Sequence, residues 1–396
     1  MPAEPSTRDR TNELWGDDWA EVRALWPLEP TVAHLNHGSY GAVPTPVREE
    51  QQSWRERMDS NPVRFFAREL DPALDQARAE VAQFLGTADE DVAFVRNVTT
   101  GVSTVLSCLP LETGDELLIT DHAYGAVRIA AERWTAQAGA RLVTVPVPLR
   151  ADDETATERI LAGVTDRTRL VVVDQVTSPT ARRMPLVTLV PALRDRGVAV
   201  LVDGAHAPGM LPVELDRLGA DFWVGNLHKW ACAPRGTAVL HAAGRWRSRL
   251  RPLVASWGEP AGFPRSFNDV GTDDPTAWLS APRALRVLDR LGLDRVRRHN
   301  VELAVRGQVE VAGSIGLSTA DLPRDPAVSM QLVPLPAGIA STQEEAWALQ
   351  DRIGEEAAVE VAVTTHAGQG FLRVSAHVYN SLSDYRRLAE QLPALL

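Results

Sequence analysis

The sequence predicts an α/β protein whose core is a mostly parallel sheet covered by helices on both faces. Short apolar segments alternate with segments of helical periodicity from about residue 72 onward. The strand-like segments are apolar throughout, which is typical of strands buried on both faces. Strands separated by helices favour parallel pairing, because a parallel neighbour can be reached only through a crossover connection.

The elements follow in order along the first two thirds of the chain. Strands are expected at 91–96, 116–120, 141–147, 169–174, 199–203, 221–225 and 237–241. Helices are expected at 99–109, 126–138, 154–164 and 186–196. Ligands of such sheets bind outside the carboxyl ends of the strands. Asp174, Asp203 and the turn at 97–101 lie at such ends, and Lys229 follows a later strand.

The pattern changes after about residue 280. A charged amphipathic helix is expected at 283–298, followed by strands near 328–333 and 371–375 and helices near 343–353 and 382–395. We therefore predict an N-terminal arm at 1–30, a large α/β domain at 31–280 and a small α+β domain at 281–396. The N-terminal segment is expected to contribute to the small domain.

Composition excludes several classes of partner. The net charge of -11 argues against nucleic acid and anionic membranes. No apolar run approaches the roughly 20 residues of a membrane helix, and residues 1–19 hold no apolar signal core. Two cysteines, Cys108 and Cys232, are too few for a disulfide framework or the usual metal cluster. We predict a soluble cytoplasmic protein without a metal.

Two segments offer groups for an anionic or aromatic ligand. NVTTG at 97–101 opens a helix, whose backbone N–H groups and hydroxyls can bind a phosphate, although a Thr there can also be a simple cap. In VDGAHAPG at 202–209, Asp203 can pair with a cationic ring nitrogen and His206 with a ring oxygen. A plain turn with an Asp cap is the alternative.

Two further segments offer an amine and a guanidinium. Lys229 in GNLHKW lies near Trp223 and Trp230, and an apolar setting keeps the amine of a Schiff-base lysine neutral. A lysine stem lying on a surface aromatic is the alternative, but a position in a strand-end loop after Asp203 favours the first interpretation. Arg373 in FLRVS can bind a substrate carboxylate through two hydrogen bonds, or form a surface ion pair.

Taken in order, VDGAHAPG, GNLHKW…APRG and LRVSAHVYN resemble the class V aminotransferase superfamily. The resemblance is strongest to its isopenicillin-N-epimerase-like branch, which includes enzymes that process cysteine conjugates in lincosamide-type antibiotic biosynthesis. LNHGSYGAVPTPV, NPVRFF and VGTDDPTAWLSAP extend the resemblance over most of the chain. It implies a fold-type I pyridoxal-5′-phosphate (PLP) enzyme, with a seven-stranded sheet in the large domain and active sites shared across a homodimer.

The resemblance also implies roles for matching residues. Lys229 would form the Schiff base and move protons at the substrate Cα, Asp203 would pair with the pyridinium nitrogen, and Tyr124 would stack on the ring. Arg373 would bind the substrate carboxylate. The remaining cofactor contacts would come from Thr99, Thr100, Ser178, His206, Asn226 and His228, and from Thr272 of the other subunit. The substrate entrance would be lined by Asn36, His37 and Gly38.

Some positions depart from the family pattern. Ala181 stands where relatives often have Gly, and Arg182 and Arg183 follow it. These arginines could read an acidic substrate, but we expect them on the surface. Cysteine desulfurases of the superfamily carry a reactive cysteine in the last third of the chain, and this chain has no cysteine after Cys232. We therefore expect no desulfurase.

Three reactions remain open once PLP is bound, because the cofactor stabilises whatever carbanion forms at Cα. We predict C–S β-elimination or decarboxylative deamination on the cysteine-like part of a natural-product intermediate. Epimerisation is the alternative, and it would need Tyr124 or His37 to act on the face opposite Lys229. A silent PLP-fold binding protein is a further alternative, which the set of Lys229, Asp203 and Arg373 disfavours.

Overall fold

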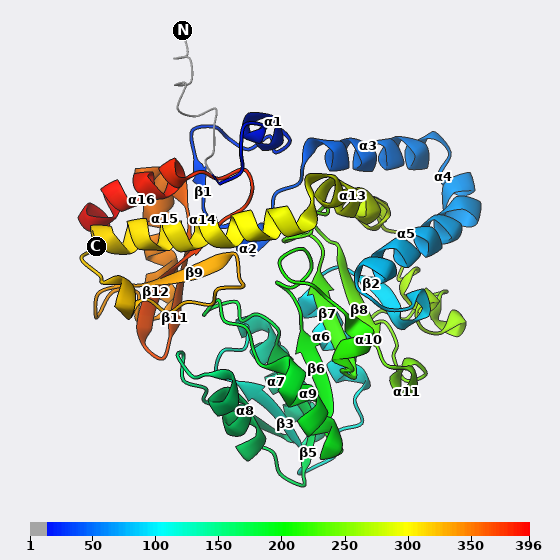
Figure 1. The fold of residues 1–396 in the computed structure, drawn as a ribbon. Helices are drawn as coiled ribbons and strands as arrows, with labels where there is room; N and C mark the ends of the chain where they lie inside the picture. The colour runs from blue at the N-terminus through cyan, green and yellow to red at the C-terminus, as the bar shows by residue number, and fades with distance from the viewer. Residues whose placement is uncertain (1–13) are drawn as a thin grey trace. The chain divides into compact units, whose positions relative to one another are not determined.

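The computed structural model describes residues 14–396, which form two compact units (Figure 1). Unit 1 consists of residues 14–46, Pro179–Ala181 and Val287–Leu396, and unit 2 consists of Val47–Ser178 and Arg182–Arg286. Residues 1–13 of the predicted arm lie outside the described residues, and the rest of the arm contains α1 (Trp19–Ala24). The predicted domain bounds stay a prediction.

Unit 2 is built on a seven-stranded sheet in the order β2-β8-β7-β6-β5-β3-β4 (Figure 1). Strands β4, β3, β5, β6 and β7 pair in parallel, and β8 runs antiparallel to both β7 and β2. The mostly parallel seven-stranded sheet is thereby confirmed. Its strands are β2 (Val92–Val95), β3 (Glu116–Thr120), β4 (Arg141–Val145), β5 (Thr168–Asp174), β6 (Ala199–Asp203), β7 (Phe222–Asn226) and β8 (Ala238–Ala242).

Helices connect these strands. They are α3 (Thr45–Ser60), α4 (Pro62–Arg64), α5 (Leu70–Phe84), α6 (Val98–Cys108), α7 (Gly125–Ala138), α8 (Asp153–Ala162), α9 (Leu186–Asp195), α10 (Leu215–Leu218), α11 (Gly244–Arg247) and α12 (Thr276–Leu279). Short 3-10 or π turns occupy Phe65–Glu69, Asp89–Asp91, Glu259–Ala261 and Arg265–Phe267.

One face of the sheet packs on α6 and α7. Alternate residues of the strands, such as Leu170 and Val172 of β5 and Ala199 and Leu201 of β6, share one buried cluster with these helices. Side chains two positions apart point to the same face of a strand. The residues that continue these sets, at 174 and 203, therefore face the side of the sheet that α6 covers.

The start of α6 is held against the sheet. A Cβ added at Gly101 would lie only 2.4 Å from Cγ1 of Val224 on β7, so only glycine allows this close approach. The packing brings the first turn of α6 beside the carboxyl ends of the central strands, where a ligand of a parallel sheet binds.

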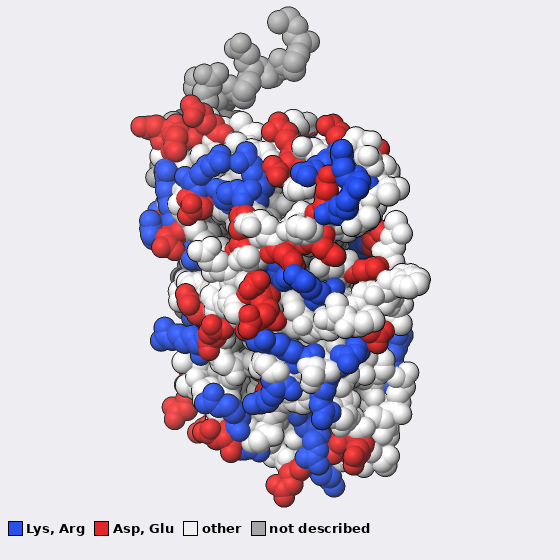
Figure 2. All heavy atoms as spheres, turned by 90° about the vertical axis from the view of Figure 1, so that its right-hand side faces the viewer, with Lys and Arg blue, Asp and Glu red and all other residues white. Residues whose placement is uncertain are grey.

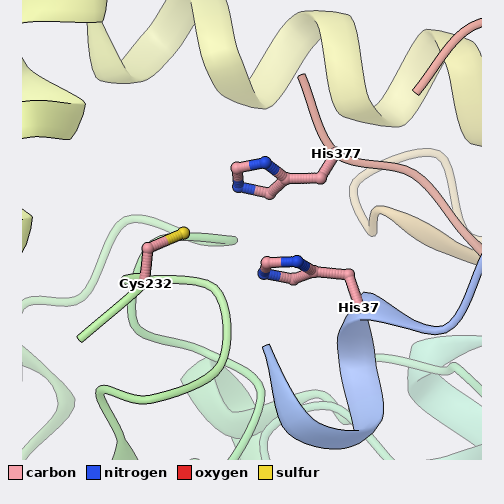
Figure 3. A group of neighbouring side chains, drawn as sticks. All are labelled: His37, Cys232 and His377. Carbon is pink, nitrogen blue, oxygen red and sulfur yellow. The ribbon is translucent and has the colours of Figure 1, made fainter. Parts of the chain in front are cut away.

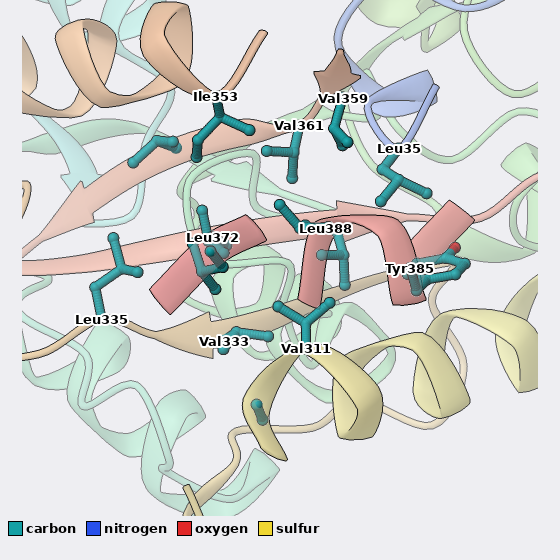
Figure 4. Close-up of a cluster of buried hydrophobic side chains, with 14 of the residues drawn as sticks. Leu35, Val311, Val333, Leu335, Ile353, Val359, Val361, Leu372, Tyr385 and Leu388 are labelled. Atoms are coloured by element: carbon teal, nitrogen blue, oxygen red, sulfur yellow. The ribbon is translucent and has the colours of Figure 1, made fainter. Parts of the chain in front are cut away.

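Unit 1 contains a three-stranded antiparallel sheet in the order β11-β12-β9 and a parallel pair of β1 and β10. Leu35, Val333, Leu372 and Leu388 belong to its core, which Figure 4 shows. Its elements are β1 (Ala33–His34), α2 (His37–Tyr40), α14 (Leu293–Ser314), a turn at Thr319–Asp321, β9 (Met330–Pro334), α15 (Gln343–Ala357), β10 (Val359–Glu360), β11 (Ala362–His366), β12 (Gln369–Ser375) and α16 (Leu382–Leu395). This smaller α+β arrangement was predicted for the C-terminal part.

The helix predicted at 283–298 is wrong as a single element. The chain forms α13 (Ala281–Leu291) and then α14, and Gly292 between them has a φ of +76° that ends the first helix. Helix α14 also extends well beyond residue 298.

The surface mixes charges of both signs. Figure 2 shows basic and acidic side chains interspersed over the viewed face rather than gathered by sign. Within residues 14–396, helices that combine the length and the apolar character needed to cross a membrane are absent.

Candidate functional site

Lys229 lies in the segment after β7, and its amine contacts the buried side chain of His206. It is the only lysine in the sequence. Its Nζ lies 3.2 Å from Nε2 of His206, and Nδ1 of the same ring accepts a hydrogen bond from the indole N–H of Trp230 at 3.2 Å. His206 and Trp230 are both buried.

The Trp230 contact decides which nitrogen of His206 carries the proton. Because Nδ1 accepts, the proton of the neutral ring lies on Nε2, which can then donate to Lys229. A nitrogen that accepts this bond is a neutral amine. The arrangement therefore favours the form of Lys229 that can attack an aldehyde.

Asp203 ends β6 as a buried carboxyl group. Its Oδ1 accepts a hydrogen bond from the Ala205 N–H at 2.9 Å. Burial raises the pKa of Asp203, while the Ala205 N–H acts in the opposite direction, as Lys229 would when protonated. A buried acid near Lys229 suits the partner of a pyridinium nitrogen.

A second acid, Asp174, ends β5 in register with Asp203. It is also buried, and burial together with the neighbouring Asp203 raises the pKa of Asp174 well above its ordinary value. Sequence reasoning placed Asp174 at a strand end but gave it no role. The sequence pattern that pointed to Asp203, an acid as the last residue of an apolar strand, is present at Asp174 as well.

The first turn of α6 brings three predicted cofactor residues together. Oδ1 of Asn97 accepts from the N–H and the hydroxyl of Thr100 at 2.8 and 3.0 Å. Oδ1 of Asn226 accepts from the N–H of Val98 at 3.0 Å, and Thr99 is exposed at this end. Asn226 thus holds the helix whose N-terminus can bind a phosphate.

Other predicted cofactor residues in unit 2 have varied surroundings. Nδ1 of His228 donates to the carbonyl of Thr237 at 2.9 Å, and burial lowers the pKa of His228 to about 4. The neutral ring then offers Nε2 only as an acceptor, so a phosphate contact would require protonation. Tyr124 precedes α7 and is 48% exposed, Ser178 is half-buried, and Thr272 is exposed. Their roles stay predictions.

In unit 1, Arg373 lies in the central strand β12 and is 3% exposed. Its Nη2 donates to Oδ1 of Asn36 at 3.3 Å and to the hydroxyl of Ser39 at 3.1 Å. Both partners are neutral, so they orient the guanidinium without compensating its charge. Sequence reasoning did not single out Ser39, because no motif links it to a residue more than 300 positions away.

His37 is buried rather than open to solvent. Its ring stacks on that of His377 with centroids 4.2 Å apart and planes 16° apart, as Figure 3 shows. Its Nδ1 lies 2.9 Å from the hydroxyl of Tyr379. Burial, with His37 nearby, lowers the pKa of His377 well below its ordinary value. Gly38 follows in the same helix and is also buried. The entrance roles of both residues stay predictions.

The two arginines after Ala181 differ. Arg182 is buried, and its Nη1 donates to the carbonyls of Pro148 at 2.9 Å and Leu149 at 3.1 Å, so the expected surface position was wrong for this residue. Arg183 is exposed, as expected. Ala181 itself has a φ of +47°, a conformation that favours glycine.

The residues of unit 2 fit PLP by their chemistry. A neutral amine, a buried carboxyl and the N-terminus of α6 match the aldehyde, the ring nitrogen and the phosphate of that cofactor. Asp203, Asn226 and α6 all belong to one face of the sheet.

The chain matches known proteins over nearly its whole length. The aminotransferase class-V family model covers residues 41–388. An isopenicillin N epimerase from Amycolatopsis lactamdurans is 35% identical over 95% of this chain and 98% of its own. A putative L-cysteine desulfhydrase 1 from Oryza sativa is 29% identical over 95% of this chain and 86% of its own.

A solved structure of a C-DES mutant with glycine covalently linked to its PLP cofactor shares the fold. Its TM-score is 0.80 at 22% identity, and the match covers 93% of this chain and 98% of that one. The fold-type I architecture and the PLP cofactor expected from the sequence are confirmed. The chain belongs to the class V aminotransferase family.

Proposed function

We propose that the protein is a PLP-dependent C–S lyase that acts on the cysteine-like part of a larger natural-product intermediate. The contact of Lys229 with His206, together with the buried Asp203 at the end of β6, carries the PLP chemistry. The C–S specificity is supported by the relative named as a putative L-cysteine desulfhydrase. Decarboxylative deamination of the same substrate class is the variant reaction.

Each residue has a separate task in this proposal. Bound PLP stabilises the negative charge that develops at Cα. Lys229 takes the Cα proton, and Asp203 keeps the ring nitrogen protonated. Arg373 binds the substrate carboxylate through its guanidinium. In β-elimination the C–S bond then breaks, and the thiolate leaves with the electron pair.

Epimerisation is the second candidate, and the relative named isopenicillin N epimerase favours it. Reprotonation from the opposite face needs a second acid. Tyr124, at 48% exposure, is better placed to exchange protons with solvent than the buried His37. We further propose a cytoplasmic homodimer, in which Thr272 of one subunit completes the cofactor site of the other.

A product analysis in heavy water separates these reactions. The holoenzyme is incubated with L-cysteine, an S-alkyl cysteine and an α-aminoadipyl peptide, and the products are identified by mass spectrometry. We expect thiol, pyruvate and ammonia from the S-alkyl cysteine. Exchange of the Cα hydrogen alone would overturn the lyase assignment in favour of an epimerase, and release of CO2 would indicate the decarboxylating reaction.

Two variants control this experiment. Lys229→Ala removes the proposed proton carrier and should abolish turnover. Arg183→Ala removes an exposed arginine and should leave it unchanged. Cofactor bound to the wild type without any turnover or exchange would indicate a binding protein.

A further inference from the structure

The central strands β5 and β6 end on two acids that lie side by side. Asp174 and Asp203 are partners in the strand register, and the N–H of Gln175 donates to the carbonyl of Asp203 at 2.7 Å, which keeps the two strand ends together. Asp174 continues the set of Leu170 and Val172, and Asp203 continues the set of Ala199 and Leu201. Both carboxyl groups therefore face the α6 side of the sheet, at 4% and 3% exposure.

Within residues 14–396, few charged groups act on the carboxyls of this pair. Lys229 is the basic group whose protonated form would act on both carboxyls, and Asp203 is the anion that acts on Asp174. On the other side of β5, β3 ends at the uncharged Thr120, and the next residue, Asp121, accepts a hydrogen bond from the N–H of Val147 at 2.9 Å. His206, the neighbour of Lys229, is neutral when it accepts from Trp230 and donates to the amine.

Two ionised carboxylates beside a single basic group in a buried site would leave at least one negative charge uncompensated, whether or not Lys229 is protonated. Neighbouring buried acids avoid this cost by retaining one proton between them. The Ala205 N–H donates to Asp203 and stabilises its ionised form, so the proton belongs on Asp174. The direction of the pKa agrees, because burial and the neighbouring Asp203 raise the pKa of Asp174 more strongly than a backbone hydrogen bond lowers it.

We propose that Asp174 is a positioning residue for the cofactor, which stays protonated and thereby confines a single negative charge to Asp203. The inference rests on the proposed role of Asp203 toward the ring nitrogen. It adds a residue to the site that acts through its neighbour, and it predicts that the electrostatics of the bound cofactor change when Asp174 loses its proton.

The test is a pH titration of the visible absorption band of the holoenzyme, in wild type and in Asp174→Asn. Asparagine has the shape of a protonated aspartic acid and cannot ionise. We expect the same spectrum in both proteins at neutral pH, an additional alkaline change in wild type, and loss of that change in the variant. PLP affinity at neutral pH should agree within about twofold.

A shift of the neutral-pH spectrum, or a PLP affinity changed by about tenfold or more in Asp174→Asn, would overturn the proposal, because Asp174 would then be ionised in wild type. Asp203→Asn serves as the matched variant and should weaken PLP binding. An Asp203→Asn protein that binds PLP normally would instead sink the proposed role of Asp203, so the two failures are distinguishable.

Infrared spectroscopy keeps the proposal testable if the variant does not fold. Wild-type holoenzyme at neutral pH should show the carbonyl band of a buried protonated carboxylic acid, and this band should disappear at alkaline pH together with the change in the visible spectrum. Absence of the infrared band at neutral pH would contradict a protonated Asp174.

Discussion

Replacing Trp230 by Phe should weaken the hydrogen bonding through His206 that keeps the Lys229 amine neutral, while an aromatic ring still fills the position. The substitution keeps an aromatic ring at a position that is 2% exposed and removes the N–H that donates to Nδ1 of His206. A buried acceptor that loses its donor costs about 1–3 kcal/mol. If this cost falls wholly on the holoenzyme, PLP affinity drops by about 5- to 150-fold.

The loss also frees the His206 proton to move to Nδ1. Nε2 would then be an acceptor, which favours a charged Lys229 over the neutral amine. PLP affinity is measured through the visible band, and the tautomer of His206 through its ¹⁵N shifts.

Trp246→Phe is the control, because it removes a comparable indole hydrogen bond to Asp221, which precedes β7 and so lies at the other end of that strand from Lys229. Unchanged PLP affinity together with a proton that stays on Nε2 in Trp230→Phe would refute the reasoning.

Substitutions at three further positions test other parts of the account. Arg373→Ala should weaken amino-acid binding by about 2–4 kcal/mol, measured as the substrate Kd of the holoenzyme. Arg373→Lys should restore only part of the lost affinity. An unchanged Kd would remove Arg373 from the site. Gly101→Ala should destabilise unit 2 by about 1–3 kcal/mol in denaturant unfolding and should lower PLP affinity, because the new Cβ would clash with Val224 near the start of α6. Normal PLP affinity would contradict the role of that turn. Glu116 accepts from Thr165, Arg141 and Arg167, and these contacts lower its pKa from 4.5 to about 2. Its contribution to stability is therefore complete above about pH 4.5 and is lost as the pH falls through about 2. Glu116→Gln should lower the free energy of unfolding by about 1–2 kcal/mol at pH 7, a value reduced by solvent screening because both arginines are 63% exposed. This loss of stability should shrink in acid. An equal loss at all pH values would refute the pKa argument.

Much of unit 2 could be predicted because its strands are buried on both faces. The bounds of β3 and β6 were predicted residue for residue, since each is an apolar segment with clear ends. Helix α3 was not predicted, because Val47 is the one fully buried residue among its described side chains and leaves little apolar periodicity. The helix boundary at Gly292 was missed for a different reason, because the sequence does not reveal whether a glycine inside a helical pattern takes a positive φ.

The candidate site divides in the same way. Lys229, Asp203 and His206 stand in local motifs that sequence reasoning could find. Asp174 lies beside Asp203 because of the register of β5 on β6. Ser39 contacts Arg373 because unit 1 folds the two distant segments together. Register and packing of distant segments are tertiary properties, and single-sequence patterns do not specify them.

The central claim is that one amine holds the cofactor, and the sequence makes it unusually open to test. Lys229 is the only lysine, so the α-amino group of the N-terminus is its one competitor among ordinary primary amines. The holoenzyme is reduced with borohydride, digested and mapped by mass spectrometry. We predict one pyridoxyl-phosphate adduct per chain, on the peptide that contains Lys229. An unmodified Lys229, or an adduct only at the N-terminus, would contradict the account.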